Sequence, residues 1–302
     1  MKLAELAEET LTQRLEGRGI LLQTGPFTVR INSGVEGFTQ LLRQFYANFP
    51  VVSEPAIADF HMRLTMPGGI RRRWRPQVLL LLDGQEVFLP FPFSHAFPLF
   101  EWGLNWCIAM QAHQYLMLHS AAVERSGRVL LLPAGSGSGK STLCAALVNR
   151  GWRLFSDEFG LVRAADGHLI PLPRPMPLKN RSIDVIRDFA PDADLGPSFH
   201  GTRKGTIAHL GTPAACVEQS GVSAPPGWLV FPCYQPSVSL RLEPISKPQA
   251  FIKLANNSFN YQLLGLRGFR EASRLVGNCD SYILSYSNLE EAIVAMDRLA
   301  ES

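Results

Sequence analysis

A glycine-rich loop between an apolar strand and a helix constrains the fold of this chain more than any other feature. Residues 129–132 are all apolar and predict a buried strand, and residues 141–150 predict a helix that ends at Gly151. The loop between them contains Ala134, Gly135, Ser136, Gly137, Ser138, Gly139, Lys140 and Ser141. Glycine adopts backbone angles that other residues avoid, so successive N–H groups can surround an anion at the positive end of the helix dipole. The sequence therefore predicts a strand–loop–helix unit with an anion site in its loop.

The loop has the spacing of a phosphate-binding P-loop (Walker A), with Ala134 at a position where glycine is usual. In this pattern Lys140 reaches the β- and γ-phosphates of a nucleoside triphosphate, and the Ser141 hydroxyl ligates Mg²⁺. Thr142 is placed near the α-phosphate. A flexible glycine–serine linker is the alternative, but the strand and helix on either side favour nucleotide binding. We therefore predict ATP, or another nucleoside triphosphate, and Mg²⁺ as cofactors.

An acidic pair follows the loop at the end of a second predicted strand, residues 152–155. Sixteen residues separate Lys140 from Asp157, which is enough for a helix and a return strand that brings the acids beside the phosphates. One carboxylate can hold Mg²⁺, and the other can accept a proton from an attacking hydroxyl. We predict Asp157 as the general base and Glu158 as the ligand on the metal side. Without the loop upstream, such a pair would indicate only a turn.

The composition argues against several other function classes. The 302 residues carry a net charge of +3, too small for the dense basic face of a nucleic-acid-binding protein. The five cysteines are scattered without a C-x-x-C pair, so neither a disulfide framework nor a zinc site is indicated. The N-terminus lacks the apolar core of a signal peptide, and no apolar tract reaches the roughly 20 residues of a membrane-spanning helix. We expect a cytoplasmic protein without a nucleic-acid or membrane partner.

Two domains are expected, with a boundary in the proline-rich segment 90–98, where each proline removes a backbone donor. Residues 1–100 mix helical patterns with strands predicted at 27–31, 58–65 and 77–82, which indicates a small α+β module that we assign to acceptor or partner binding. Residues 101–302 would form the catalytic domain. Within it we predict a helix at 102–118, a hairpin of strands 119–124 and 128–133, a strand at 281–286 and a last helix capped by Asn288.

Three elements together resemble the HPr serine kinase/phosphorylase family. They are His119 and Ser120 before the hairpin, the glycine-rich loop, and residues 154–158, which end in the acidic pair. The resemblance covers roughly residues 115–160, and residues 258–261 are more similar to the HPr-kinase-related kinase A group than to true HPr kinases. Ser120, Thr142 and Glu158 stand where the family has glycine, glutamate and aspartate.

The resemblance implies an α/β nucleotide-binding fold shared with phosphoenolpyruvate carboxykinases. It also implies a kinase that transfers the γ-phosphoryl group of ATP to a hydroxyl, most often a serine of a peptide or small protein. His119 would lie next to the loop, against the γ-phosphate or the catalytic carboxylate; a buried histidine at a strand end is the alternative. True HPr kinases form hexamers, which implies a homo-oligomer here. The first 100 residues do not resemble their N-terminal domain, and we do not expect HPr itself as the acceptor.

Two further loops and two other functions stay open. Residues 200–209 form a basic, glycine-punctuated segment in which Lys204 could close over the triphosphate, or could simply face solvent. The proline-rich segment 173–180 could position the acceptor or phosphate through Arg174 or Lys179. The same parts would serve a small-molecule hydroxyl kinase, or a nucleotide-binding regulatory module that transfers no phosphate.

Overall fold

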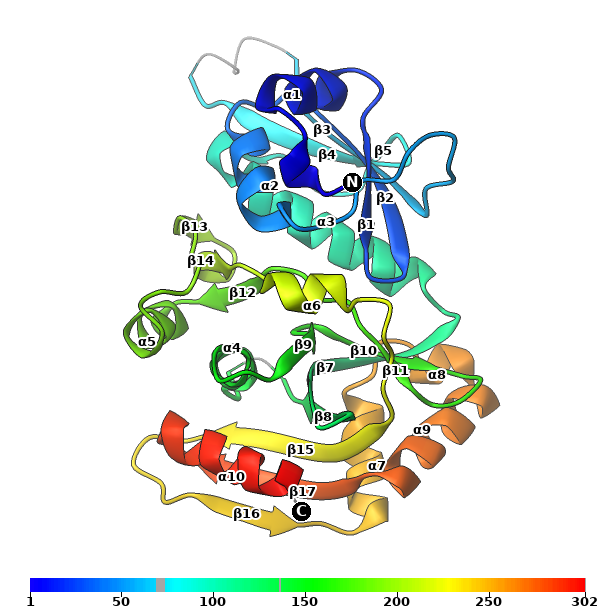
Figure 1. The fold of residues 1–302 in the computed structure, drawn as a ribbon, viewed down its shortest axis with the longest axis vertical. Helices are drawn as coiled ribbons and strands as arrows, with labels where there is room; N and C mark the ends of the chain where they lie inside the picture. Colours follow the sequence, from blue (N-terminus) through cyan, green and yellow to red (C-terminus); the bar gives the residue numbers. More distant parts are fainter. Residues whose placement is uncertain (69–73, 136, 302) are drawn as a thin grey trace. The chain divides into compact units, whose positions relative to one another are not determined.

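Two units make up the chain, and the glycine-rich loop lies in the second (Figure 1). The first unit comprises Met1–Gln111 and Ser198–Ile207, and the second comprises Ala112–Pro197 and Ala208–Ser302. The computed structural model describes residues 1–68, 74–135 and 137–301. Among these residues, no helix is both long and apolar enough to cross a membrane.

The first unit is built on a mixed six-stranded sheet with helices. Its elements are η1 (Leu3–Glu5), α1 (Glu8–Glu16), β1 (Ile20–Thr24), β2 (Phe27–Ser33), α2 (Phe38–Tyr46), β3 (Phe60–Thr65), β4 (Gln77–Leu82), β5 (Gln85–Glu86), β6 (Phe91–Pro92), η3 (Phe93–His95) and α3 (Ala96–Gln111). The strand order is β1-β2-β3-β4-β5, with β6 beside β4. β2 and β3 are parallel because α2 connects them, whereas β1–β2 and β3–β4 are antiparallel. Buried and half-buried residues alternate along β2, as expected for a strand with one face on the core.

Helix α3 corrects two sequence predictions. The expected boundary at residue 100 falls inside this helix, which packs on β3 and β4 and so belongs wholly to the first unit. Gly103 permits the close approach, since a Cβ there would lie 2.1 Å from Leu80 Cδ2. The helix predicted at 102–118 is wrong at both ends. It begins at Ala96, with Pro98 in the first turn, where a missing N–H is harmless, and residues 115–118 form a strand instead.

The remaining elements follow along the chain, and most of them belong to the second unit, which is built on an eight-stranded sheet. They are β7 (Tyr115–Arg125), β8 (Arg128–Pro133), α4 (Lys140–Asn149), β9 (Arg153–Ser156), β10 (Phe159–Arg163), β11 (Leu169–Ile170), β12 (Met176–Lys179), α5 (Arg181–Phe189), β13 (Phe199–Thr202), β14 (Gly205–Leu210), α6 (Ala214–Glu218), β15 (Pro226–Tyr234), β16 (Arg241–Pro244), α7 (Lys247–Asn256), α8 (Tyr261–Leu264), α9 (Leu266–Asn278), β17 (Asp280–Tyr286) and α10 (Leu289–Glu301). β13 and the start of β14 belong to the first unit, and β14 lies between β12 and β13 in a separate three-stranded sheet.

The order of the large sheet is β11-β10-β7-β8-β15-β17-β16, with β9 beside β7. β15 pairs in parallel with β8 on one side and β17 on the other, and it is buried over most of its length. Such a strand needs cover on both faces. One core cluster includes residues of α4, α5 and α10, and a second includes residues of α7 and α9. The fold class is therefore mixed α/β, as predicted.

The sequence prediction is close for four elements. These are α4 and β9, which follow β8, and β17 and α10 at the end of the chain. The glycine-rich loop joins β8 to α4, and Gly151 follows α4 with φ +91°. At the C-terminus, Asn288 caps α10 by accepting a hydrogen bond from Glu291 N at 3.2 Å. The sequence missed β1 and the buried parallel strand β15 because their apolar runs show no clear alternation.

Candidate functional site

The predicted cradle residues form a tight turn at the N-terminus of α4. Gly137 and Gly139 both have φ +86°, in the left-handed region that favours glycine. The Ser138 hydroxyl donates to the Gly135 carbonyl at 2.9 Å and so ties the turn together. A Cβ on Gly135 or Gly137 would meet no described atom within 4 Å, so this side of the loop has room for a bound group. Ser136, also predicted to bind the nucleotide, lies outside the described residues.

Gly139, the third glycine of the loop, is held in place together with Ser138 by the last residues of two strands. A Cβ on Gly139 would lie 2.4 Å from Tyr286 Oη, and the Tyr286 hydroxyl donates to the Gly139 carbonyl at 3.2 Å. Tyr234 N donates to the Ser138 carbonyl at 3.0 Å. The two tyrosines end β17 and β15, so the loop sits at the carboxyl edge of the parallel strands, where open α/β sheets bind their ligands. Sequence reasoning missed both tyrosines, because nothing in a strand sequence shows what its last residue touches.

Two buried charged side chains beside the loop lack hydrogen-bond partners. Lys140 is 6% exposed and Asp157 is 5% exposed. Within the described part of the chain, neither Lys140 Nζ nor either Asp157 carboxylate oxygen has a hydrogen-bond partner of good geometry. Buried ionisable groups are normally paired, because an unpaired charge loses its hydration without compensation. The two residues therefore form a polar cluster suited to binding a polar or charged ligand.

The carboxyl of Asp157 responds to both burial and its neighbours. Burial raises its pKa to about 6, the Lys140 ammonium opposes this rise, and the nearby Glu158 carboxylate adds to it. The Ser141 hydroxyl and Lys179 also lower the pKa of Asp157. Asp157, the acid predicted at the end of the second strand, therefore lies within interaction range of Lys140 and Ser141 of the loop.

The turn from β9 to β10 presents the acidic pair. Ser156 Oγ accepts hydrogen bonds from Glu158 N at 3.2 Å and Phe159 N at 2.9 Å, which fixes a tight turn with Asp157 inside it. Ser120 N donates to the Glu158 carbonyl at 3.2 Å, so β7 holds the same turn from the side. Ser156 and Ser120 therefore hold the backbone of this turn, from which Asp157 interacts with Lys140 and Ser141 of the loop.

Glu158 pairs with the predicted histidine. His119 Nε2 lies 3.4 Å from Glu158 Oε1, and the two side chains are 30% and 26% exposed. Burial raises the pKa of Glu158, but the His119 hydrogen bond and the Lys140 charge outweigh it and lower the pKa to about 2. Glu158 is thus held as a carboxylate on the more open side of the acidic pair, with an imidazole in contact.

A short segment before α8 covers the histidine. His119 N donates to the Asn257 carbonyl at 2.7 Å, and Phe259 N donates to the Met117 carbonyl at 2.9 Å, so residues 257–259 lie along β7. The Phe259 ring is centred 5.4 Å from the His119 ring and 4.9 Å from the Phe159 ring, yet Phe259 is 43% exposed. The sequence indicated this segment only through the family resemblance, and gave Phe259 no role.

The remaining predicted residues lie at different places. Thr142 is half-buried in the first turn of α4. Lys179 acts on the pKa values of both acids, whereas Arg174 is buried and interacts with His209. Lys204 belongs to the first unit, where its Nζ lies 5.3 Å from the centre of the Trp102 ring, and its predicted closure over the triphosphate stays a prediction.

Mg²⁺ with a triphosphate fits the donor set. No cluster of three or more His, Cys, Asp and Glu side chains that could hold a metal occurs among the described residues. Magnesium in nucleotide sites takes few protein ligands, keeps water and completes its shell with phosphate oxygens. The Ser141 hydroxyl and the Asp157 carboxylate supply two hard oxygen donors, and phosphate oxygens would accept from the buried Lys140 ammonium.

A scan of protein-family models and a search of curated proteins both find no match to this sequence.

Proposed function

We propose that this protein is an ATP- and Mg²⁺-dependent kinase that transfers the γ-phosphoryl group to a hydroxyl, with a serine of a peptide or small protein as the favoured acceptor. The observation that carries the proposal is the buried pair of Lys140 and Asp157, both without a hydrogen-bond partner of good geometry among the described residues, at the helix end that follows a P-loop. A triphosphate and its metal ion are the ligand that this combination of groups suits best.

Binding in this proposal is the task of the loop. Backbone N–H groups around Gly137 and Gly139, the Lys140 ammonium and the N-terminus of α4 would bind phosphate oxygens. Bound Mg²⁺ would neutralise charge on the β- and γ-phosphates. Ser141 and one carboxylate would hold the ion, and the open space beside Gly135 and Gly137 leaves room for the phosphates.

The geometry favours an exchange of the roles that the sequence suggested for the two acids. Asp157 is the buried acid and interacts with Ser141, so we place it on the metal side. Glu158 is more exposed and contacts His119, so we assign proton acceptance from the hydroxyl to the Glu158–His119 pair. A carboxylate that contacts an imidazole can orient the ring and stabilise the imidazolium formed when it takes a proton.

The test combines nucleotide binding with phosphoryl transfer. Calorimetry with Mg²⁺ and ATP measures binding, and γ-labelled ATP with a library of serine peptides measures transfer. We expect Glu158→Gln and His119→Gln to lower turnover roughly 10²- to 10⁴-fold at an unchanged Mg²⁺ requirement. Asp157→Asn should raise the Mg²⁺ concentration needed for half-maximal activity. The exposed Glu243, on β16, provides the control variant Glu243→Gln.

Each outcome has a separate meaning. Absence of Mg²⁺–ATP binding by the wild-type protein would refute the proposal. If the protein binds Mg²⁺–ATP but transfers phosphate to no peptide, protein or small-molecule hydroxyl, the alternative function of a nucleotide-binding regulatory module is favoured. If Glu158→Gln shifts the Mg²⁺ requirement and Asp157→Asn does not, the original sequence assignment of the two roles stands.

A further inference from the structure

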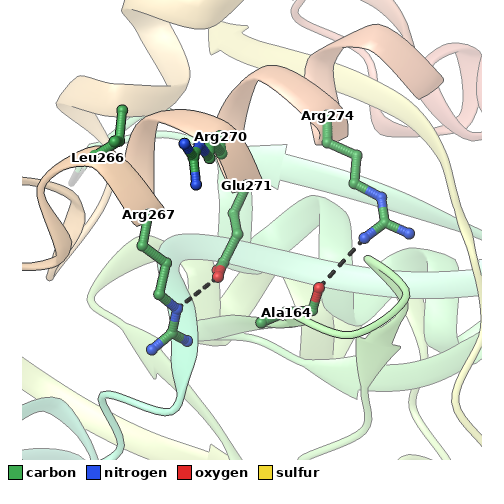
Figure 2. A pocket seen from close by; sticks show the side chains of 6 residues that line it. All are labelled: Ala164, Leu266, Arg267, Arg270, Glu271 and Arg274. Carbon is green, nitrogen blue, oxygen red and sulfur yellow. Dashed lines mark hydrogen bonds and ion pairs between the residues drawn. The ribbon is translucent and has the colours of Figure 1, made fainter.

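A basic pocket lies on helix α9 of the second unit, away from the glycine-rich loop in sequence. It has a volume of about 290 Å³ and is lined by Ala164, Leu266, Arg267, Arg270, Glu271 and Arg274. Figure 2 shows the three arginines and the glutamate projecting from the same helix around it. Their spacing of three and four residues places the arginines on one helix face. Three arginines and one glutamate leave the pocket with two net positive charges.

Two of these arginines already make hydrogen bonds within the protein. Arg267 Nε donates to Glu271 Oε1 at 2.7 Å, and Arg267 also donates to backbone carbonyls just before β7. Arg274 donates to the carbonyls of residues 164–166, after β10 (Figure 2). Arg270 lies between them, is exposed, and has no hydrogen-bond or ion-pair partner among the residues that the structure describes. Arg270 is therefore the guanidinium that can bind an external carboxylate, and a bidentate pair is its preferred geometry.

Two paired strands connect this pocket to the candidate catalytic site. β7 runs from the residues clamped by Arg267 to His119, and β10 runs back from Phe159, opposite His119, to Arg163, next to the pocket residue Ala164. Five steps along β7, from Gln114 to His119, span about 17 Å at the usual rise of a strand. An extended peptide would cover the same span with about five residues.

An exposed apolar surface borders the same path. The chain from residue 257 to Arg267 follows β7 in the opposite direction, since His119 N bonds to the Asn257 carbonyl and Arg267 bonds to the Gln114 carbonyl. Along this segment Phe259 is 43% exposed, Leu263 68% and Leu266 64%. Exposed apolar side chains along one short segment, with cations at its end, are typical of a peptide-binding surface.

From these observations, and on the basis of the proposed kinase function, we infer that the acceptor is an acidic peptide segment that docks along α8 and α9. Its hydroxyl would lie at the Glu158–His119 pair, its apolar side chains on Phe259 and Leu266, and an Asp or Glu about five residues away on Arg270. The positive pocket favours an acidic residue there and disfavours a basic one.

Direct binding tests this docking without any phosphoryl transfer. The probes are fluorescein-labelled peptides with alanine at the acceptor position, apolar residues beside it, and one aspartate placed two, five or eight residues away on either side. We expect the five-residue spacing to bind tightest and its affinity to fall with added salt. Arg270→Gln should weaken that peptide about tenfold, the usual effect of losing one charge-assisted contact, and remove the spacing preference.

Arg241→Gln, on the exposed strand β16, is the matched control and should bind as the wild type does. Equal affinity at all spacings, or unchanged binding by Arg270→Gln, would overturn the inference. Tighter binding of an RNA oligonucleotide than of any acidic peptide would also overturn it. In a parallel assay with the serine versions, intact docking without phosphoryl transfer would count against the kinase and not against the surface, whereas transfer without a spacing preference would count against the surface alone.

Discussion

Both units bury a carboxylate to the same extent, but they treat it differently. Glu101, on α3 of the first unit, is 5% exposed and accepts a hydrogen bond from the Tyr46 hydroxyl at 2.5 Å, among packed aromatic rings. Asp157 in the second unit is also 5% exposed, but its oxygens have no hydrogen-bond partner of good geometry in the described part of the chain. A buried acid that accepts a hydrogen bond from the fold contributes to its stability, whereas a buried acid beside an unbonded lysine indicates a place for a ligand. Burial alone does not distinguish the two.

The largest expected effect is on the paired acid. Glu101→Ala removes the acceptor of the Tyr46 hydroxyl and opens space in an aromatic core, so we expect it to lower the free energy of unfolding by about 3 kcal/mol. Urea denaturation followed by fluorescence measures this change. Nucleotide binding by the folded fraction should be unaffected. A loss below about 0.5 kcal/mol would show that the hydrogen bond to Tyr46 contributes little, and would break the comparison.

Next comes the lysine of the loop. Lys140→Met keeps the length of the buried stem and removes the charge, so Mg²⁺–ATP should bind about 30-fold more weakly, which is about 2 kcal/mol of charge-assisted hydrogen bonding. Calorimetric titration gives this affinity directly. The unfolding free energy of the nucleotide-free protein should change little, because the variant loses the attraction between Lys140 and Asp157 but also the cost of burying an ammonium that has no hydrogen-bond partner among the described residues. A variant that loses stability but keeps its affinity for ATP would assign Lys140 a structural role.

A third buried titratable residue gives a pH-dependent effect. His209 is 2% exposed, and burial together with the charge of Arg174 lowers its pKa to about 3, from an ordinary value of 6.5. As the pH falls below 6.5 the unfolded chain takes up a proton that the folded protein does not, so this residue lowers stability progressively between pH 6.5 and pH 3. Between pH 7 and about pH 5 the loss should be about 2 kcal/mol.

His209→Gln should remove this part of the pH dependence. The measurement is the urea midpoint of wild type and variant at pH 7 and pH 5. If both proteins lose the same stability over that interval, His209 is not the group responsible.

The sequence predicted the placement of those candidate-site residues that depends on local geometry. Glycines that need positive φ, a lysine at a helix start and an acid at a strand end are all properties of short segments, and Gly139, Lys140 and Asp157 are found together as the spacing required. The helix predicted at 102–118 failed because only a short polar stretch, residues 111–114, separates the apolar residues of α3 from those of β7, and hydrophobicity without a clear period does not distinguish a buried helix from a buried strand.

Contacts between distant segments could not be predicted. Tyr286 lies 147 positions from the glycine whose carbonyl it contacts, and the Asn260 side chain bonds to β7 over a separation of more than 140 residues. These contacts depend on which strands become neighbours in the sheet, and the order β8-β15-β17 is a property of the whole unit. The contact of Phe259 with His119 was not predicted for the same reason, because it joins segments that are distant in the sequence.

The smallest expected effect has the opposite sign to the first, and it decides the comparison. Asp157→Asn replaces a buried carboxylate by an amide of the same shape, which removes the free energy of burying an ion but also deprives Lys140 of its nearby negative charge. We expect a net gain of about 1 kcal/mol in the unfolding free energy of the nucleotide-free protein. The isosteric change Glu101→Gln should instead destabilise the fold, because it weakens a hydrogen bond that the aromatic core already holds. Urea titrations of the wild type and the two variants, each with and without Mg²⁺–ATP, give the change in unfolding free energy for each variant under both conditions.

If ligand stabilises the wild type but not Asp157→Asn, the carboxylate is retained at a thermodynamic disadvantage because the ligand requires it. If both substitutions destabilise the protein equally and neither alters the response to Mg²⁺–ATP, then Asp157 is as structural as Glu101, and the site must be assigned from the Glu158–His119 pair alone.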